Sequence, residues 1–196
     1  MSRLASLAVY CGSATPADPL YMETARAVGT ALAERGITIV YGGGRLGLMG
    51  ALADAALTAG GKVIGVIPDA LVTTEVAHRG LTQLHVVPDM HARKSLFTSL
   101  SDGFLTLPGG VGTMDELWEA VSWAQLGYHA KPVGLLNAGG FYDQLLAFAA
   151  HMTAVGFIRP AHAGILIARD ALDALIEAME HYQPHRPITA IPIEQL

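Results

Sequence analysis

The chain has 196 residues, of which 52% are apolar and 15% are charged, and its net charge is −5. This composition predicts a globular domain with a large core, and the absence of any Lys or Arg block argues against a nucleic-acid partner or a polybasic membrane surface. The sequence contains no apolar run of the roughly 18 residues that a membrane span needs and no secretory signal pattern at its start. Because Cys11 is the one cysteine, we expect no internal disulfide and a cytoplasmic location.

Strands and helices alternate along the chain. In chain order we expect a strand at 4–10, a helix at 19–35, a strand at 37–41, a helix at 51–58, strands at 62–67 and 81–87, a helix at 90–100 capped by Asp89, a strand at 103–107, a helix at 115–126, a strand at 132–136, a helix at 141–153, a strand at 163–168 and a helix capped by Asp170 that ends near 181. This alternation predicts a Rossmann-like α/β fold, a doubly wound parallel sheet of about seven strands with helices on both faces.

The domain organisation follows from the same pattern. Residues 1–182 are expected to form a single Rossmann-like domain. Residues 183–196 hold three of the ten prolines and are expected to form an extended C-terminal arm. In folds of this class, ligands bind at the carboxyl ends of the strands, at the point where the strand order reverses.

The most informative stretch is the glycine loop at 108–113, which lies between an apolar strand and an amphipathic helix. Glycines let the backbone approach a ligand closely, and the free N–H groups of a first helical turn attract anions. Thr113 fits either a helix cap or a phosphate donor. Glu116, three residues later, fits either a capping box with Thr113 or a catalytic carboxylate that faces the ligand.

A second glycine loop follows the strand at 37–41. Gly42, Gly44 and Gly47 spell the G-x-G-x-x-G of a dinucleotide fingerprint, with Asp69 as a candidate ribose-binding acid. This motif follows the second strand of the chain rather than the first, and a dinucleotide site would leave the loop at 108–113 without a role. Two glycine loops therefore fit one mononucleotide better than a dinucleotide, and a dinucleotide oxidoreductase is kept as an alternative.

Further candidate residues lie at other strand ends. Ser13 follows the first strand and can donate a hydrogen bond to a phosphate. Arg93 and Lys94 lie in the first turns of their helix, where cations oppose the helix dipole, so they indicate an anionic ligand unless they are simply a solvated pair. An anion cradle with one arginine and one carboxylate suits a bond whose cleavage passes through an oxocarbenium-like state. Arg93 would hold the phosphate or ribose, and Glu116 would stabilise the cation or activate water.

Several other chemistries are not supported by the sequence. The eight histidines are scattered singly, so we expect no metal, and the chain lacks both a P-loop and a G-x-S-x-G elbow. Three lysines offer no convincing site for a pyridoxal cofactor, and no other cofactor is expected. A second carboxylate for glycosidic-bond cleavage, if one is needed, would come from Glu75 or Asp115.

Two motifs together resemble a known family. Residues 90–94 read MHARK and residues 108–116 read PGGVGTMDE, which resemble the MHxRK and PGGxGTxxE motifs of the Lonely Guy (LOG) family. Residues 41–44, 47–50, 11–13, 123–127 and 131–137 support the resemblance, which runs from about Leu4 to Ile176. Members of this family are cytokinin-activating nucleoside 5′-monophosphate phosphoribohydrolases.

The resemblance implies hydrolysis of an N6-substituted adenosine monophosphate, or AMP, to free base and ribose 5-phosphate, on a Rossmann-like homodimer with the site near the interface. It implies that Arg93 and Glu116 are catalytic. The remaining expected contacts with the substrate or its phosphate are Ser13, Gly43, Gly44, Glu75, Lys94, Gly109, Gly110, Val111, Gly112, Thr113 and Asp115.

Two departures from the family pattern concern the substrate. Ala14 stands where a second serine is common, and Arg45 lies in a loop that small or polar residues often fill. Relatives have often carried a lysine decarboxylase label, which the scarcity of lysines argues against here. A non-catalytic nucleotide sensor or carrier on the same fold stays as the alternative function, although the Arg93–Glu116 pair speaks against it.

Overall fold

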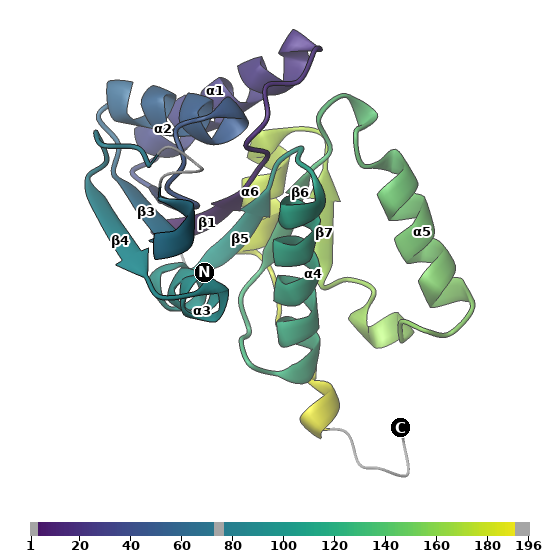
Figure 1. The fold of residues 1–196 in the computed structure, drawn as a ribbon. Coiled ribbons are helices and arrows are strands. Elements are labelled where there is room, and N and C mark those ends of the chain that lie inside the picture. The colour runs from purple at the N-terminus through teal and green to yellow at the C-terminus, as the bar shows by residue number, and fades with distance from the viewer. Residues whose placement is uncertain (1–3, 73–76, 191–196) are drawn as a thin grey trace.

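The computed structural model describes residues 4–72 and 77–190 of the chain. They form one parallel sheet of seven strands in the order β4–β3–β2–β1–β5–β6–β7 (Figure 1). The strands are β1 (Ser6–Tyr10), β2 (Thr38–Tyr41), β3 (Val63–Pro68), β4 (Gln83–Val87), β5 (Gly103–Thr106), β6 (Val133–Leu136) and β7 (Leu166–Arg169). The expected doubly wound α/β fold is therefore confirmed.

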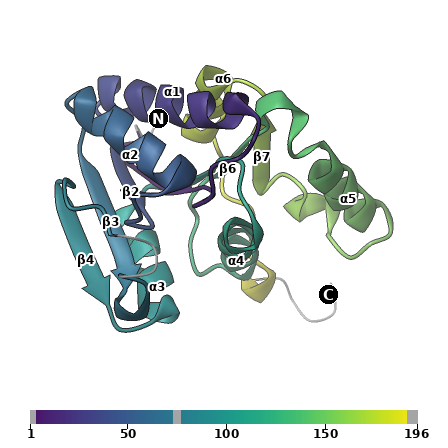
Figure 2. The same cartoon turned by 45° about the horizontal axis from the view of Figure 1, so that its top comes forward.

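Helices cover both faces of this sheet. They are α1 (Pro19–Glu34), α2 (Gly47–Thr58), α3 (Met90–Leu100), α4 (Val111–Leu126), α5 (Asp143–Ala154) and α6 (Leu172–Glu180). Helices α1, α2 and α6 pack on one face, while α3 and α4 pack on the other, as Figure 2 shows. The central strands β1 and β5 are therefore buried on both sides, which explains why their sequences are continuously apolar.

The strand order reverses next to β1. From β1 the chain builds β2, β3 and β4 toward one edge, and it then returns to the other side of β1 with β5, β6 and β7. Ala8 of β1 accordingly lies between Val40 of β2 and Phe104 of β5. The crevice beyond the carboxyl ends of β1 and β5 is the topological switch point, where ligands bind in such folds.

Helix α4 begins earlier than the sequence predicted. Gly110 is its N-cap and Val111 its first residue, so Thr113 is the third residue of the helix. The capping-box interpretation of Thr113 and Glu116 is therefore wrong, and the structure records no side-chain cap on this helix among the residues it describes. Gly110 lets the chain pass directly from the loop into the helix, which leaves the backbone N–H groups of the first turn without a capping side chain.

Other helix ends test the sequence predictions. Asp89 caps α3 as expected, because its carboxylate accepts a hydrogen bond of 2.8 Å from the Ala92 N–H. Asp170 does not cap α6, whose N-cap is Ala171; its carboxylate instead accepts from the Asn137 side-chain amide at 3.2 Å. Phe148 of α5 is exposed.

The described part of the C-terminal arm runs past the end of α4. Residues 188–190 form a 3-10 turn, and the Thr189 hydroxyl donates to the Leu126 carbonyl at 3.1 Å. Pro187 lies against Gly127, which ends α4 in the left-handed conformation. Within the described ranges, the structure contains no helix with the length and apolar character needed to span a bilayer.

Candidate functional site

A pocket of about 390 Å³ occupies the switch point. Its walls come from the loops that follow β1, β2 and β5 and from the first turns of α3 and α4. The structure brings together in its lining many residues that the sequence singled out, namely Ser13, Arg93, Gly110, Val111, Gly112, Thr113, Asp115 and Glu116. Residues that are 100 positions apart in the sequence thus meet because parallel strands end at the same edge of the sheet.

Arg93 is the buried cation of this pocket. It lies on α3 one turn after the Asp89 cap, and only 6% of its side chain is exposed. The guanidinium carbon lies 5.4 Å from the Phe97 ring centroid, a cation–π contact that orients the group. Its Nε is buried and has no hydrogen-bond partner within the described residues. A buried orphan donor is costly in a folded protein, so this guanidinium retains capacity for a ligand.

Glu116 is the carboxylate that faces this arginine. It lies on the second turn of α4, its side chain is 12% exposed, and its Oε1 lies 3.7 Å from the Arg93 Nη2. This separation is longer than the 2.7–2.9 Å of a close charge-assisted hydrogen bond. The two groups therefore attract each other and stay in place without closing into a tight ion pair.

The first turn of α4 presents open backbone donors to the pocket. The backbone N–H groups of Val111, Gly112 and Thr113 have no helical partner, because they precede the first helical hydrogen bond from the Met114 N–H to the Gly110 carbonyl. A Cβ built at Gly110 or Gly112 would meet nothing within 4 Å, so both positions face open space. This turn combines open N–H donors with the positive end of the helix dipole, which is the arrangement that binds phosphate.

The loops after β1 and β5 hold each other in place behind this turn. The Gly12 N–H donates to the Pro108 carbonyl at 3.1 Å, and the Met49 N–H donates to the Gly12 carbonyl at 3.3 Å. Gly109 lies between Gly12 and Thr113, where a side chain would collide with the Thr113 hydroxyl. Gly109 therefore packs behind the first turn of α4 and lines a small neighbouring cavity, not the main pocket.

Lys94 lies beside the pocket rather than in its lining. Its ammonium forms ion pairs with the Asp115 Oδ2 at 2.9 Å and with the Glu119 Oε2 at 3.0 Å, and 13% of its side chain is exposed. Burial lowers the pKa of this ammonium, but the two carboxylates raise it by more, so its pKa lies above the usual value. Lys94 is therefore a permanently charged link between α3 and α4.

The remaining expected site residues lie elsewhere. Gly43 and Gly44 follow β2 outside the pocket lining, where the Gly43 carbonyl accepts from the His78 N–H at 2.9 Å and Gly44 forms an isolated bridge with Ala77. They fasten the segment that follows residue 76 to the end of β2. Glu75, expected to contact the substrate, lies outside the described residues.

The pocket also contains residues that the sequence analysis did not assign to it. They include Val9, Gly12, Gly42, Met49, Leu71 and Met90. Gly42 is the most informative, because a Cβ at this position would collide with the Arg93 guanidinium. In the sequence, a glycine directly after a buried strand indicates a close approach of another group, but the G-x-G-x-x-G pattern suggested a dinucleotide-binding turn instead. Cys11 also lines the pocket, and burial raises the pKa of its thiol, which keeps it protonated.

The glycines of the G-x-G-x-x-G motif serve packing within the protein. Gly42 leaves room for Arg93, and Gly47, at φ +56°, lies against the backbone of Ser13 and Ala14. Within residues 4–72 and 77–190, the structure brings together no group of three His, Cys, Asp or Glu side chains that could hold a metal ion.

The fold is shared with solved structures of other proteins. The molybdenum cofactor carrier protein of Chlamydomonas reinhardtii matches with a TM-score of 0.65 and 23% identity, over 91% of this chain and 97% of that one. A molybdenum cofactor binding protein from Rippkaea orientalis matches with a TM-score of 0.66 and 22% identity, over 92% and 98%. At this level of identity the likeness establishes the architecture only.

Sequence comparisons identify closer relatives. Residues 49–179 match the model of a family described as possible lysine decarboxylase. The chain is 44% identical over 183 residues to a probable cytokinin riboside 5′-monophosphate phosphoribohydrolase of Oryza sativa subsp. japonica, covering 93% of this chain and 81% of that protein. It is 45% identical over 172 residues to the cytokinin riboside 5′-monophosphate phosphoribohydrolase of Rhodococcoides fascians, covering 87% of each. With both expected motifs at the pocket, this chain belongs to the LOG family of cytokinin riboside 5′-monophosphate phosphoribohydrolases.

Proposed function

We propose that this protein hydrolyses the N-glycosidic bond of a nucleoside 5′-monophosphate, and that its substrate is an adenosine monophosphate substituted at N6 or AMP itself. The relatives carry the name of this reaction, and the pocket supports it. The single observation that carries the proposal is the Arg93–Glu116 pair, which is held at 3.7 Å beside a helical anion site. A protein that only binds a nucleotide has no need for a carboxylate next to a phosphate cradle.

The phosphate position follows from the first turn of α4. The N–H groups of Val111, Gly112 and Thr113 would donate to the phosphate oxygens, and the exposed Ser13 across the pocket offers a further hydroxyl. Anchoring the phosphate there places the ribose toward Arg93 and Glu116, because both side chains line the same pocket. Binding energy from the phosphate would thereby orient the reacting carbon, which is how a remote group contributes to catalysis.

The chemical step uses the two charged side chains. The bond between the anomeric carbon and the base nitrogen breaks, and its electron pair leaves with the base, which takes up the proton that the attacking water loses. The Glu116 carboxylate stabilises the positive charge that develops on the ribose or activates the attacking water, whose oxygen forms the new bond. Arg93 holds the ribose or phosphate with its planar fork. The products are the free base and ribose 5-phosphate.

Product chromatography after incubation with isopentenyladenosine monophosphate and, in parallel, with AMP tests the proposal. We expect free base from the wild-type protein and none above background from Glu116→Gln, which removes the charge and keeps the shape. Calorimetry should show that the variant still binds AMP. Full base release by Glu116→Gln would refute the catalytic role, and binding by the wild type without turnover of either nucleotide would favour the sensor or carrier alternative.

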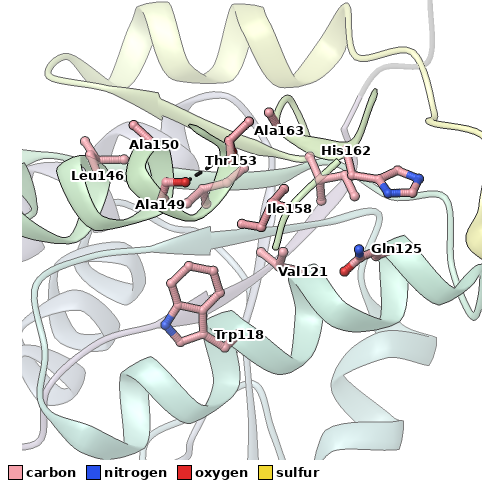
Figure 3. A pocket seen from close by; sticks show the side chains of 12 residues that line it. Trp118, Val121, Gln125, Leu146, Ala149, Ala150, Thr153, Ile158, His162 and Ala163 are labelled. Carbon is pink, nitrogen blue, oxygen red and sulfur yellow. Dashed lines mark hydrogen bonds between the residues drawn. The ribbon is translucent and has the colours of Figure 1, made fainter. Parts of the chain in front are cut away.

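We also propose that the protein forms a homodimer through α4 and α5. Every residue of α5 is at least partly exposed, and two exposed aromatic side chains are Phe148, at 56% in the middle of the helix, and Phe157, at 85% just after its end. An apolar groove of about 380 Å³ runs between the two helices, where Trp118 and Val121 of α4 lie opposite Leu146 of α5 (Figure 3). Exposed apolar surface of this kind is typical of protein interfaces.

Light scattering coupled to size-exclusion chromatography tests this assembly. The expected mass is twice that of the 20.6 kDa chain, and Phe148→Glu should shift it toward the monomer. A wild-type protein that stays monomeric at concentrations of tens of micromolar would contradict the proposal.

A further inference from the structure

Lys94 makes a second contact between α3 and α4, directly beside the catalytic pair. Lys94 follows Arg93 on α3, and its partners Asp115 and Glu119 flank Glu116 on α4. The Lys94 contacts of 2.9 and 3.0 Å are short, whereas Arg93 and Glu116 stay 3.7 Å apart. Helices α3 and α4 are therefore joined by close ion pairs at Lys94, while the charged groups of Arg93 and Glu116 stay farther apart.

We propose that Lys94 is a positioning residue, a strut between α3 and α4 that sets the separation of Arg93 and Glu116. The inference rests on the proposed function, in which that pair performs the chemistry. An ammonium has three donors, and two of those of Lys94 already point at carboxylates of α4. Lys94 is also absent from the residues that line the pocket. To bind a phosphate, Lys94 would have to give up these ion pairs each time substrate binds.

The charges at this helix contact explain why a strut is needed. The start of α4 presents three carboxylates, Asp115, Glu116 and Glu119, to the two cations of α3. Lys94 neutralises the outer two of them, so Arg93 can keep its distance from Glu116. Without the ammonium, the Arg93 guanidinium would face three carboxylates alone and would be drawn into a close ion pair. Arg93 and Glu116 would then satisfy each other instead of acting on the substrate.

The kinetic test compares Lys94→Met with Lys62→Met. Lys62 is an exposed lysine that lies just before β3, at the amino ends of the strands and away from the pocket. We expect Lys94→Met to lower kcat at least 10-fold while KM for the monophosphate changes less than threefold, since small misplacements of catalytic groups cost rate. Lys62→Met should retain both values. Lys94→Arg should recover part of kcat, and Glu119→Gln should lower kcat in the same way.

The opposite pattern would overturn the inference. If Lys94 binds phosphate directly, Lys94→Met raises KM and the inhibition constant of ribose 5-phosphate at least 10-fold and leaves kcat nearly intact. In that case Glu119→Gln would not reproduce the effect.

Two measurements test the positioning role of Lys94 even if the wild type releases no base. Calorimetric titration with ribose 5-phosphate should give the same affinity for the wild type and Lys94→Met, and a crystal structure of the variant should show the Arg93 Nη2 and Glu116 Oε1 at hydrogen-bond distance. Unchanged separation together with lost binding would refute the strut. A lack of turnover in the wild type would refute the proposed function alone. If Lys94→Met does not fold, Glu119→Gln removes the same contact with a smaller change.

Discussion

Gly42 offers a sharp test of how the pocket is built. This glycine follows β2 directly, and a Cβ added to it would collide with the Arg93 Nη2 and approach the Met49 sulfur to 3.0 Å. The guanidinium is held between the Phe97 ring and the Glu116 carboxylate and lines the pocket, so the added Cβ would push it toward the space that the substrate needs. We therefore expect Gly42→Ala to move the guanidinium by on the order of 1 Å, the scale at which misplacement affects catalysis.

The magnitude follows from that shift. A misplacement of about 1 Å can cost a factor of roughly 100, so Gly42→Ala should lower kcat/KM by about 10- to 100-fold. This corresponds to about 1.4–2.8 kcal/mol of lost transition-state stabilisation. Initial rates of base release from isopentenyladenosine monophosphate give this quantity. The melting temperature should be measured on the same sample, because overpacking a core costs about 1–3 kcal/mol of stability by itself.

Gly156→Ala is the matched control. Gly156 lies in the exposed turn after α5 with φ +89°, so an added Cβ strains the backbone there without meeting any neighbour within 4 Å. This variant should lose stability and keep its kcat/KM, which separates the effect of instability from that of a displaced arginine. If Gly42→Ala kept wild-type kcat/KM while folded, then clearance for Arg93 would not be the reason for a glycine at this position.

Two further predictions concern stability. Burial lowers the pKa of His129 to about 4, although the hydrogen bond of its ring to the Ala120 carbonyl opposes this shift. Between pH 6.5 and 4 the unfolded state therefore binds more protons than the folded state. The free energy of unfolding should accordingly fall by up to about 1.4 kcal/mol per pH unit as the pH decreases. Urea titrations at pH 7 and pH 5 check this, and His129→Gln should flatten the dependence. The buried Tyr142 hydroxyl donates to the Leu107 carbonyl at 2.7 Å. Tyr142→Phe should therefore cost about 1–3 kcal/mol in the same titration, and an unchanged midpoint would contradict that role.

Much of the fold followed from the sequence because its signals are local. Apolar runs predicted six strands, and an alternating pattern predicted the strand at 81–87, all to within a few residues. The alternation of strands with helices predicted the parallel sheet. The strand order was not available in the same way, because no local pattern states that β5 returns to pair with β1. That pairing places the loops at 12 and 108 side by side and thereby creates the pocket.

The candidate site was only partly predictable for the same reason. Arg93 and Glu116 stood out because a cation near a helix start and a carboxylate after a glycine loop are unusual, and the fold brings both to one edge. The partners of Lys94 depend on how α3 packs beside α4, which no spacing within either segment reveals. Thr113 was misinterpreted from a local pattern. Its spacing to Glu116 fits a capping box, but α4 already begins at Val111, so Thr113 lies inside the helix.

The glycine fingerprint shows why the position of a motif in the topology decides its meaning. In a dinucleotide-binding fold the fingerprint turn lies at the switch point, where its second glycine lets the backbone approach a pyrophosphate. Here the switch point lies between β1 and β5, while the letters G-x-G-x-x-G follow β2, one strand away. At that position Gly42 makes room for an arginine side chain, and Gly47 makes room for the loop after β1. The motif thus shapes the wall of the pocket, while the first turn of α4 supplies the open N–H groups that the proposed mononucleotide site needs.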